Sequence, residues 1–193
     1  MMSVSNEKKQ LANYVANIFD GKASVFTYGD DNEKSKIAIL HAEESPNVGE
    51  TSYSTIGLSD YNIDLDVESG PLRVEIVAAA PSDLKEYGNV ISTCAFNIIN
   101  SGYSCFPGTI YPDVVQMYYP DYHMKHIMFV SPFLWDEKLE TKNMEDKIIA
   151  WLQAIPISES EYQYVEKNGV EIFLDLLEKS NIDILDLDRE SVV

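Results

Sequence analysis

Apolar residues between positions 84 and 99 recur at spacings of three and four, which is the period of an α-helix. They are Leu84, Tyr87, Val90, Ile91, Cys94, Ala95, Ile98 and Ile99. Because so broad an apolar stripe must be shielded from water, it predicts a helix that organises the core. Pro81, with Ser82 and Asp83 beside it, is typical of a helix start, and Gly102 is typical of a helix end.

The segment before this helix has the two-residue period of β-strands. Strands are expected at 24–28, 37–41, 53–58, 61–67 and 72–79. In the fourth of these strands, polar residues alternate with Tyr61, Ile63, Leu65 and Val67, which indicates that one face is exposed to solvent. Turn-forming residues at 29–32 and 69–71 separate the strands, so the segment predicts an antiparallel sheet.

Both ends of the chain have helical patterns, and two more strands are expected at 126–132 and 148–157. An amphipathic helix is predicted at 7–19. Ser158 and Glu161 have the spacing of a capping box, and the helix that follows is expected to carry apolar residues on one face. These residues are Ile172, Phe173, Leu176 and Leu177. The fold class predicted is a single α+β domain, with a mixed or antiparallel sheet packed against a long central helix and helices at both termini.

The formal net charge of −18 excludes several classes of partner. Nucleic acids and anionic membranes require basic surfaces, so neither is expected to bind this chain directly. A basic protein is a suitable partner, although acidity that serves only solubility explains the charge equally well. The chain has no apolar run of membrane length, and Cys94 and Cys105 match no zinc or redox motif, so we expect a cytoplasmic protein with reduced thiols.

Motifs for catalysis are absent from the sequence, and we expect no enzyme activity, cofactor or metal. His123 and His126 are three residues apart at a predicted strand, which directs their side chains to opposite faces. The acidic residues at 64–75 resemble a calcium loop, but their spacing fits a solvated strand better. Glu75 shares a strand face with Arg73, which indicates an ion pair. A hydrolase site around His123, His126 and Glu75 remains an alternative.

Two segments are candidate partner-binding surfaces. The connection at 111–122 is rich in tyrosine, which is common at interface cores, or its tyrosines cover the sheet. The segment from 157 to 193 has ten Asp or Glu against three Lys or Arg, which gives −7 of the net charge. It either meets a basic partner or forms a solvated face. The candidate residues are Tyr111, Tyr118, Tyr119, Tyr122, Glu159, Glu161, Asp186, Asp188 and Glu190.

The order of several short motifs resembles the Suppressor-of-fused-like domain family over about residues 24–190. The motifs are Thr55-Ile56-Gly57-Leu58-Ser59-Asp60, Glu75, Ala80-Pro81, Phe106-Pro107-Gly108, His126-Ile127-Met128-Phe129, Ile155-Pro156-Ile157-Ser158-Glu159-Ser160-Glu161 and Asp188-Arg189. The resemblance divides the chain into an N-terminal helix at 1–23 and a Suppressor-of-fused-like domain at 24–193. Within the family, the chain most resembles the bacterial branch of immunity proteins, or antitoxins.

The resemblance implies a non-catalytic protein that neutralises a cognate toxin, in this branch a nuclease of the LXG class. It also suggests a purpose for the acidity, because a nuclease presents a basic surface that an acidic inhibitor can occupy. The animal regulator with this domain restrains a transcription factor. An adaptor or sequestering protein for a cellular partner is therefore the first alternative to an immunity protein.

Overall fold

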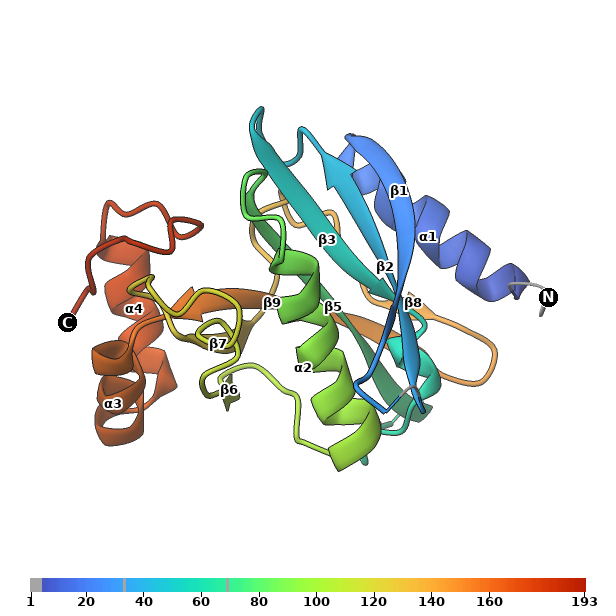
Figure 1. Cartoon of the computed structure of the whole chain (residues 1–193). Coiled ribbons are helices and arrows are strands. Elements are labelled where there is room, and N and C mark those ends of the chain that lie inside the picture. Colours follow the sequence, from blue (N-terminus) through green and yellow to red (C-terminus); the bar gives the residue numbers. More distant parts are fainter. Residues whose placement is uncertain (1–4, 33, 69) are drawn as a thin grey trace.

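A single mixed sheet runs through the middle of the computed structural model, which describes residues 5–32, 34–68 and 70–193. The strand order is β1-β2-β3-β5-β9-β7-β6, with β4 paired to β5 and β8 paired to β9 (Figure 1). The strands are β1 Lys22–Gly29, β2 Lys36–Glu43, β3 Glu50–Ile56, β4 Asp66–Val67, β5 Gly70–Pro81, β6 Ile110–Tyr111, β7 His126–Val130, β8 Lys142–Asn143 and β9 Ile148–Ile157. All neighbours are antiparallel except β5 and β9, which are parallel.

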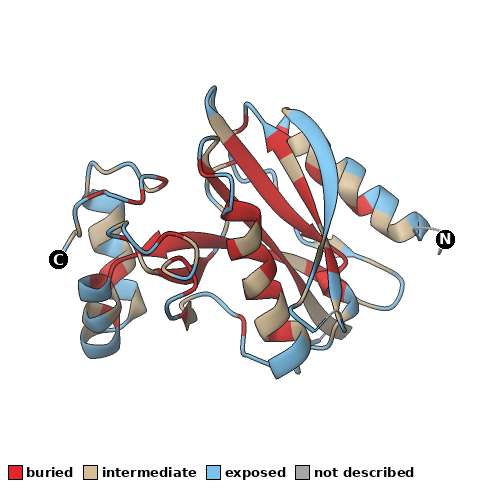
Figure 2. Ribbon diagram, viewed as in Figure 1, coloured by how far each residue is buried: buried red, intermediate tan, exposed pale blue. Residues whose placement is uncertain are grey.

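Helices cover both faces of this sheet, which explains why its central strands are largely buried (Figure 2). The helix α2 Tyr87–Ser101 packs on one face, and α1 Asn6–Phe19 packs on the other through Leu11, Val15 and Phe19. The C-terminal helices α3 Glu159–Asn168 and α4 Val170–Lys179 cover the far end, against β7 and β9. The predicted α+β class is confirmed.

The central helix begins later than the sequence predicts. Pro81 ends strand β5, where it pairs with Glu50, and the amide of Ser82 donates to the Gly49 carbonyl. A turn then brings the chain to Tyr87, where α2 begins. The prediction of a helix start at Pro81 was wrong because the sheet ladder extends up to the proline. The predicted stop is confirmed, since Gly102 caps the helix in the left-handed region at φ 63°.

The strand predicted at 61–67 is mostly irregular. Of these residues, strand β4 includes Asp66 and Val67 alone, and a short 3-10 helix, η1 Leu58–Asp60, precedes the segment. Asn62 and Asp64 bond to each other through their side chains, and Asp64 lies at φ 54°. Such local hydrogen bonds compete with a sheet ladder. The predicted turn at 69–71 includes Ser69, which lies outside the described residues.

The C-terminal helix is two helices. The capping box is confirmed: Ser158 accepts from the Glu161 amide, and the Glu161 carboxylate accepts from the Ser158 amide. Gly169, at φ 92°, then separates α3 from α4. The predicted common face of α4 is wrong in part, because Phe173 is buried whereas Ile172 is 52% exposed.

Candidate protein-binding site

The two candidate binding segments lie side by side at the β7 end of the sheet, where the 111–125 connection meets the C-terminal residues (Figure 1). The Met124 amide donates to the Leu187 carbonyl at 2.8 Å. The His123 amide donates to the Asp188 carboxylate at 3.3 Å, and the His123 ring bonds the Arg189 carbonyl at 2.9 Å. Segments far apart in sequence therefore form one surface.

A buried ion pair holds the C-terminal residues in place. Arg189 donates to both oxygens of the Glu161 carboxylate, at 2.6 and 2.8 Å, and to the Pro156 carbonyl at 3.2 Å. The Val192 amide donates to the same carboxylate at 3.1 Å. Glu161 thus joins the start of α3 to the end of the described chain. Its side chain lies inside the fold, so it is not available to a partner.

Burial alternates along the C-terminal residues, which fixes the direction of the acidic side chains. Leu185, Leu187 and Arg189 are buried, so the residues between them face solvent. These outward residues are Asp186 and Asp188, and Glu190, directly after Arg189, is exposed as well; all three are predicted contacts. Their carboxylates form an exposed acidic row beside the 111–125 connection.

Two more carboxylates of this surface flank the buried ring of His126. Its Nδ1 accepts from the Asp113 amide at 2.8 Å, and its Nε2 lies 3.0 Å from the Glu159 carboxylate. The Asp113 carboxylate is 3.4 Å from Nδ1. Hydrogen bonds from Gln163 and His126 hold the pKa of Glu159 below its ordinary value. Glu159 therefore keeps its negative charge on the surface.

The candidate tyrosines are mainly part of the fold. Tyr111 is buried, with its ring 4.9 Å from that of Phe129, and Tyr119 is nearly buried. Tyr118 is half-buried and shares a hydrogen bond with Thr93 of α2 at 2.7 Å. Tyr122 is also half-buried, and its ring packs edge-on against Tyr119. These positions fit tyrosines that cover the sheet, and Tyr118 and Tyr122 alone among the four keep a substantial part of their surface exposed.

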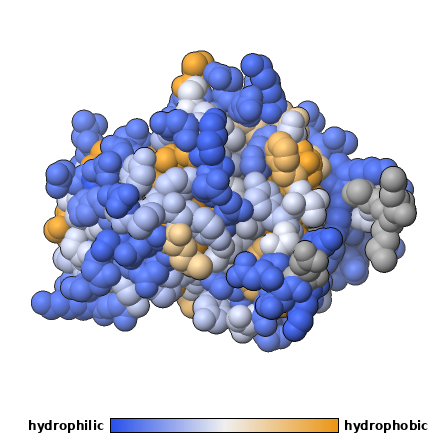
Figure 3. Space-filling model, in the orientation of Figure 1, coloured by the Kyte–Doolittle hydropathy of each residue, from blue (hydrophilic) through white to orange (hydrophobic). Residues whose placement is uncertain are grey.

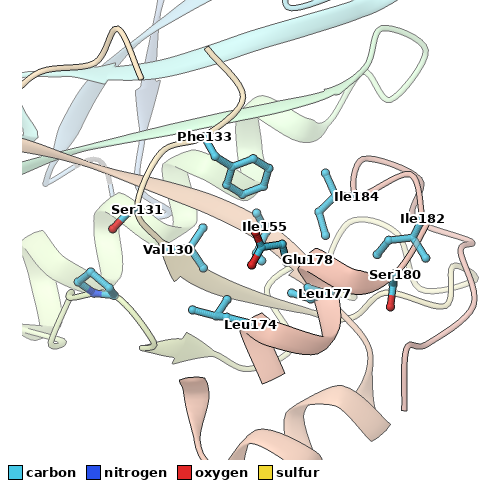
Figure 4. Close-up of a pocket in the computed structure, with 11 residues that line it drawn as sticks. Val130, Ser131, Phe133, Ile155, Leu174, Leu177, Glu178, Ser180, Ile182 and Ile184 are labelled. Atoms are coloured by element: carbon cyan, nitrogen blue, oxygen red, sulfur yellow. The ribbon is translucent and has the colours of Figure 1, made fainter. Parts of the chain in front are cut away.

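An apolar pocket of about 570 Å³ has Ile182 and Ile184 in its lining, which come shortly before the acidic row in the sequence (Figure 4). It lies between the ends of β7 and β9, helix α4 and the residues that follow α4. Its lining residues are Pro107, Val130, Ser131, Phe133, Ile155, Leu174, Leu177, Glu178, Ser180, Ile182 and Ile184. Glu178 is the one charged residue in this lining. Sequence reasoning missed the pocket, although the apolar pair Ile182 and Ile184 beside the acidic row was a signal for it.

Glu75 is not paired with Arg73, contrary to the sequence prediction. Its fully buried carboxylate accepts hydrogen bonds from the hydroxyls of Thr55 and Ser59 and from the amides of Gly57, Leu58 and Ser59. Burial raises the pKa of Glu75, and these five donors oppose the rise. Arg73 donates instead to the Leu72 carbonyl. Glu75 therefore fixes the turn after β3, which explains why the Thr55–Asp60 motif and Glu75 occur together.

The three residues of the alternative hydrolase site do not meet. Glu75 pairs with Trp151 of β9, whereas His126 pairs with Ile157, which is six residues and roughly 20 Å further along the same strand. The ring of His123 turns outward to the C-terminal residues. Within the described ranges, no group of three potential metal ligands comes together. In the same ranges, no helix is long and apolar enough to cross a membrane.

The fold presents two surface features of a kind found at protein interfaces, the exposed acidic row and the apolar pocket. The family model described as Suppressor of fused protein (SUFU) matches residues 33–190, and the chain belongs to this family. The resemblance inferred from the motifs is thereby confirmed.

A relative from Bacillus subtilis (strain 168), named Immunity protein YqcF, is 52% identical over 192 residues, which is 100% of both chains. A crystal structure of a putative SUFU homolog from Neisseria gonorrhoeae FA 1090 has a TM-score of 0.73 at 14% identity, covering 97% of both chains. The structure of a Sufu-Fu complex has a TM-score of 0.68 at 12% identity, covering 96% of this chain and 92% of that one. A crystal structure of Drosophila Suppressor of Fused has a TM-score of 0.66 at 11% identity, and the match covers 94% of this chain and 50% of that one. These structures support the fold assignment.

Proposed function

We propose that this chain is an immunity protein that binds a cognate toxin and blocks its active surface. The observation that carries the proposal is the 52% identity, over the whole of both chains, to the protein named Immunity protein YqcF. The prediction that this chain is a binding protein and not an enzyme agrees with this relationship. Inhibition by binding requires a stable, complementary surface, and the buried pair of Glu161 and Arg189 keeps the acidic row ordered before any partner arrives.

The toxin is proposed to be a nuclease of the LXG class, with a basic substrate surface. The acidic row of Asp186, Asp188 and Glu190, together with Glu159, offers the opposite charge. Surfaces of opposite charge accelerate the association of two proteins and orient them relative to each other. The neighbouring apolar pocket offers a place for an anchoring side chain, which is where interfaces concentrate their binding energy.

Co-expression with a candidate toxin from a neighbouring gene tests the proposal. We expect the two proteins to co-purify, and we expect the nuclease activity of the toxin to fall to background when the chain is added in equal amount. No complex and undiminished nuclease activity would rule the proposal out. The complex is expected to form in the cytoplasm, where the buried free thiols of Cys94 and Cys105 stay reduced.

An adaptor or sequestering role is the second candidate. The structural match to the chain in a Sufu-Fu complex favours it, because that match covers 96% of this chain. Purification of the chain from its native cell distinguishes the two roles. A toxin among the co-purifying proteins supports immunity, whereas a cellular regulator in the absence of any toxin supports the adaptor role.

A further inference from the structure

Strand β1 forms an open edge of the sheet. It pairs with β2 along its whole length, from Lys22 opposite Glu43 to Gly29 opposite Lys36, and no other strand of the described chain lies beside it. In an antiparallel ladder every second residue of an edge strand points its amide and carbonyl away from the sheet. A row of backbone donors and acceptors is therefore free to pair with another strand.

The side chains of β1 leave this edge uncovered. Seven of its eight residues are exposed, including Val25 at 53% and Phe26 at 52%, which alternate to opposite faces. Figure 3 shows apolar surface at the position of β1 in Figure 1. Native sheets protect such edges with charges, prolines or bulges. The six residues 23–28 have no charge and no proline, and the register with β2 has no bulge.

The charge of β1 argues against a basic partner at this edge. The chain has a net charge of −18, yet β1 contains no carboxylate and one lysine, Lys22. A basic protein is attracted to the acidic surfaces elsewhere on the molecule. A second copy of this chain, in contrast, is repelled over most of its surface and meets the least repulsion at β1. The edge therefore suits self-association.

We propose that β1 pairs antiparallel with β1 of a second copy, so that one continuous sheet crosses a two-fold axis. Residues that point their amides outward must face each other, so the axis passes through one residue of β1. With the axis at Phe26, the two Phe26 rings lie across from each other and Lys22 lies opposite Asp30 of the second copy, twice in the dimer. With the axis at Val25, Lys22 would instead lie opposite Tyr28 of the second copy, so this pairing of opposite charges would be lost.

The register centred on Phe26 is therefore favoured. The Asp30 side chain is held in place at the end of β1, because its carboxylate accepts from the Lys34 amide at 2.7 Å and from the Asn100 side chain at 2.9 Å. Pairing along a single strand buries less area than the roughly 1,200–2,000 Å² of a stable interface, so we expect a dissociation constant of about 10–100 µM. Added salt should strengthen the dimer, because it screens the repulsion between two acidic chains.

Sedimentation of the full chain between about 1 and 500 µM tests self-association. We expect a shift from monomer to dimer, and we expect Phe26→Lys to remove the shift because it places a like charge on the axis. Phe106→Lys is the matched control, since Phe106 is 50% exposed and lies away from β1. A wild-type chain that stays monomeric over the whole range overturns the proposal, and so does equal loss in both variants.

Disulfide cross-linking tests the register independently. Under copper-phenanthroline oxidation, Phe26→Cys should form a cross-linked dimer because residue 26 faces its own copy. Ser24→Cys is the control: it is exposed on the same face of β1, but four residues separate it from its copy, about 13 Å. The native Cys94 and Cys105 are buried and do not compete. Equal cross-linking of the two variants contradicts this pairing. Loss of toxin binding in Phe26→Lys, with a monomeric wild type, would assign the edge to another partner.

Discussion

The Arg189 guanidinium and the Glu161 carboxylate form a two-point ion pair, with N···O distances of 2.6 and 2.8 Å, and both side chains are shielded from water. A buried pair of this geometry offsets the cost of removing two charges from solvent, but it leaves a large penalty if one partner is lost. The packing of the C-terminal residues therefore depends on both side chains.

Replacement of Arg189 by methionine should lower the free energy of unfolding by about 3–5 kcal/mol, because Glu161 is then a buried charge without its partner. The double variant Arg189→Met with Glu161→Leu should lose less, since it buries no charge. Arg73→Met is the control, because Arg73 is half-buried and bonds a neighbouring carbonyl. Urea unfolding measures all three. A loss in Arg189→Met no larger than in the control would contradict this account.

Filling the apolar pocket should weaken toxin binding without affecting the fold. Ile182 lines the pocket, so Ile182→Trp occupies part of its volume and should raise the dissociation constant by about tenfold or more. Ile172→Trp is the matched control, because Ile172 lies on the exposed side of α4. Titration calorimetry with the toxin gives both constants. If the two variants bind alike, the pocket takes no part in the interface.

Removal of the outward carboxylates should slow association in a salt-dependent way. The triple variant Asp186→Asn, Asp188→Asn and Glu190→Gln should reduce the association rate constant roughly tenfold at low ionic strength. At high ionic strength the difference should nearly vanish, because exposed charges are screened. The control neutralises three acids near the other end of the sheet: Asp31, Asp66 and Glu68. Stopped-flow binding at two salt concentrations distinguishes these outcomes, and an equal effect of the two variants would exclude local steering.

Acid should destabilise the protein through His41. Burial lowers the pKa of this imidazole to about 4, although Glu43 opposes the shift. The unfolded chain takes up the proton near pH 6.5, whereas the folded chain resists it, so stability present above pH 6.5 is lost as the pH falls toward 4. His41→Gln removes the titrating group and should lose less stability between pH 7 and pH 5 than the wild type. Urea midpoints at the two pH values measure this, and parallel losses would show that other groups dominate.

The sequence predicted those parts of the fold that depend on local pattern. The apolar stripe of α2 and the capping box at Ser158 act within a few residues of chain, so spacing alone revealed them. The environment of Glu75 could not be predicted in this way. The alternation of residues on β5 suggested Arg73 as its partner. Its five donors come instead from the end of β3 and the turn that follows, which tertiary packing brings to Glu75.

The candidate site was predictable in part for the same reason. The outward direction of Asp186, Asp188 and Glu190 follows from their alternation with buried residues, so composition and pattern pointed to them. The burial of Glu161 follows from Arg189, which is 28 residues away, and spacing could not show that contact. The pocket is assembled from chain segments between Pro107 and Ile184, and no local pattern describes such a cavity.

The position of β9 affects when the protein can fold during translation. Strand β9 is inserted between β5 and β7, both of which are made earlier, and its parallel partner β5 begins 78 residues before it. The core of the sheet therefore cannot form until residues up to 157 have left the ribosome. Arg189, which pairs with Glu161, is synthesised later still. The nascent chain therefore keeps β5 without its parallel partner until residues up to 157 have left the ribosome, and during that time this apolar strand is exposed to aggregation.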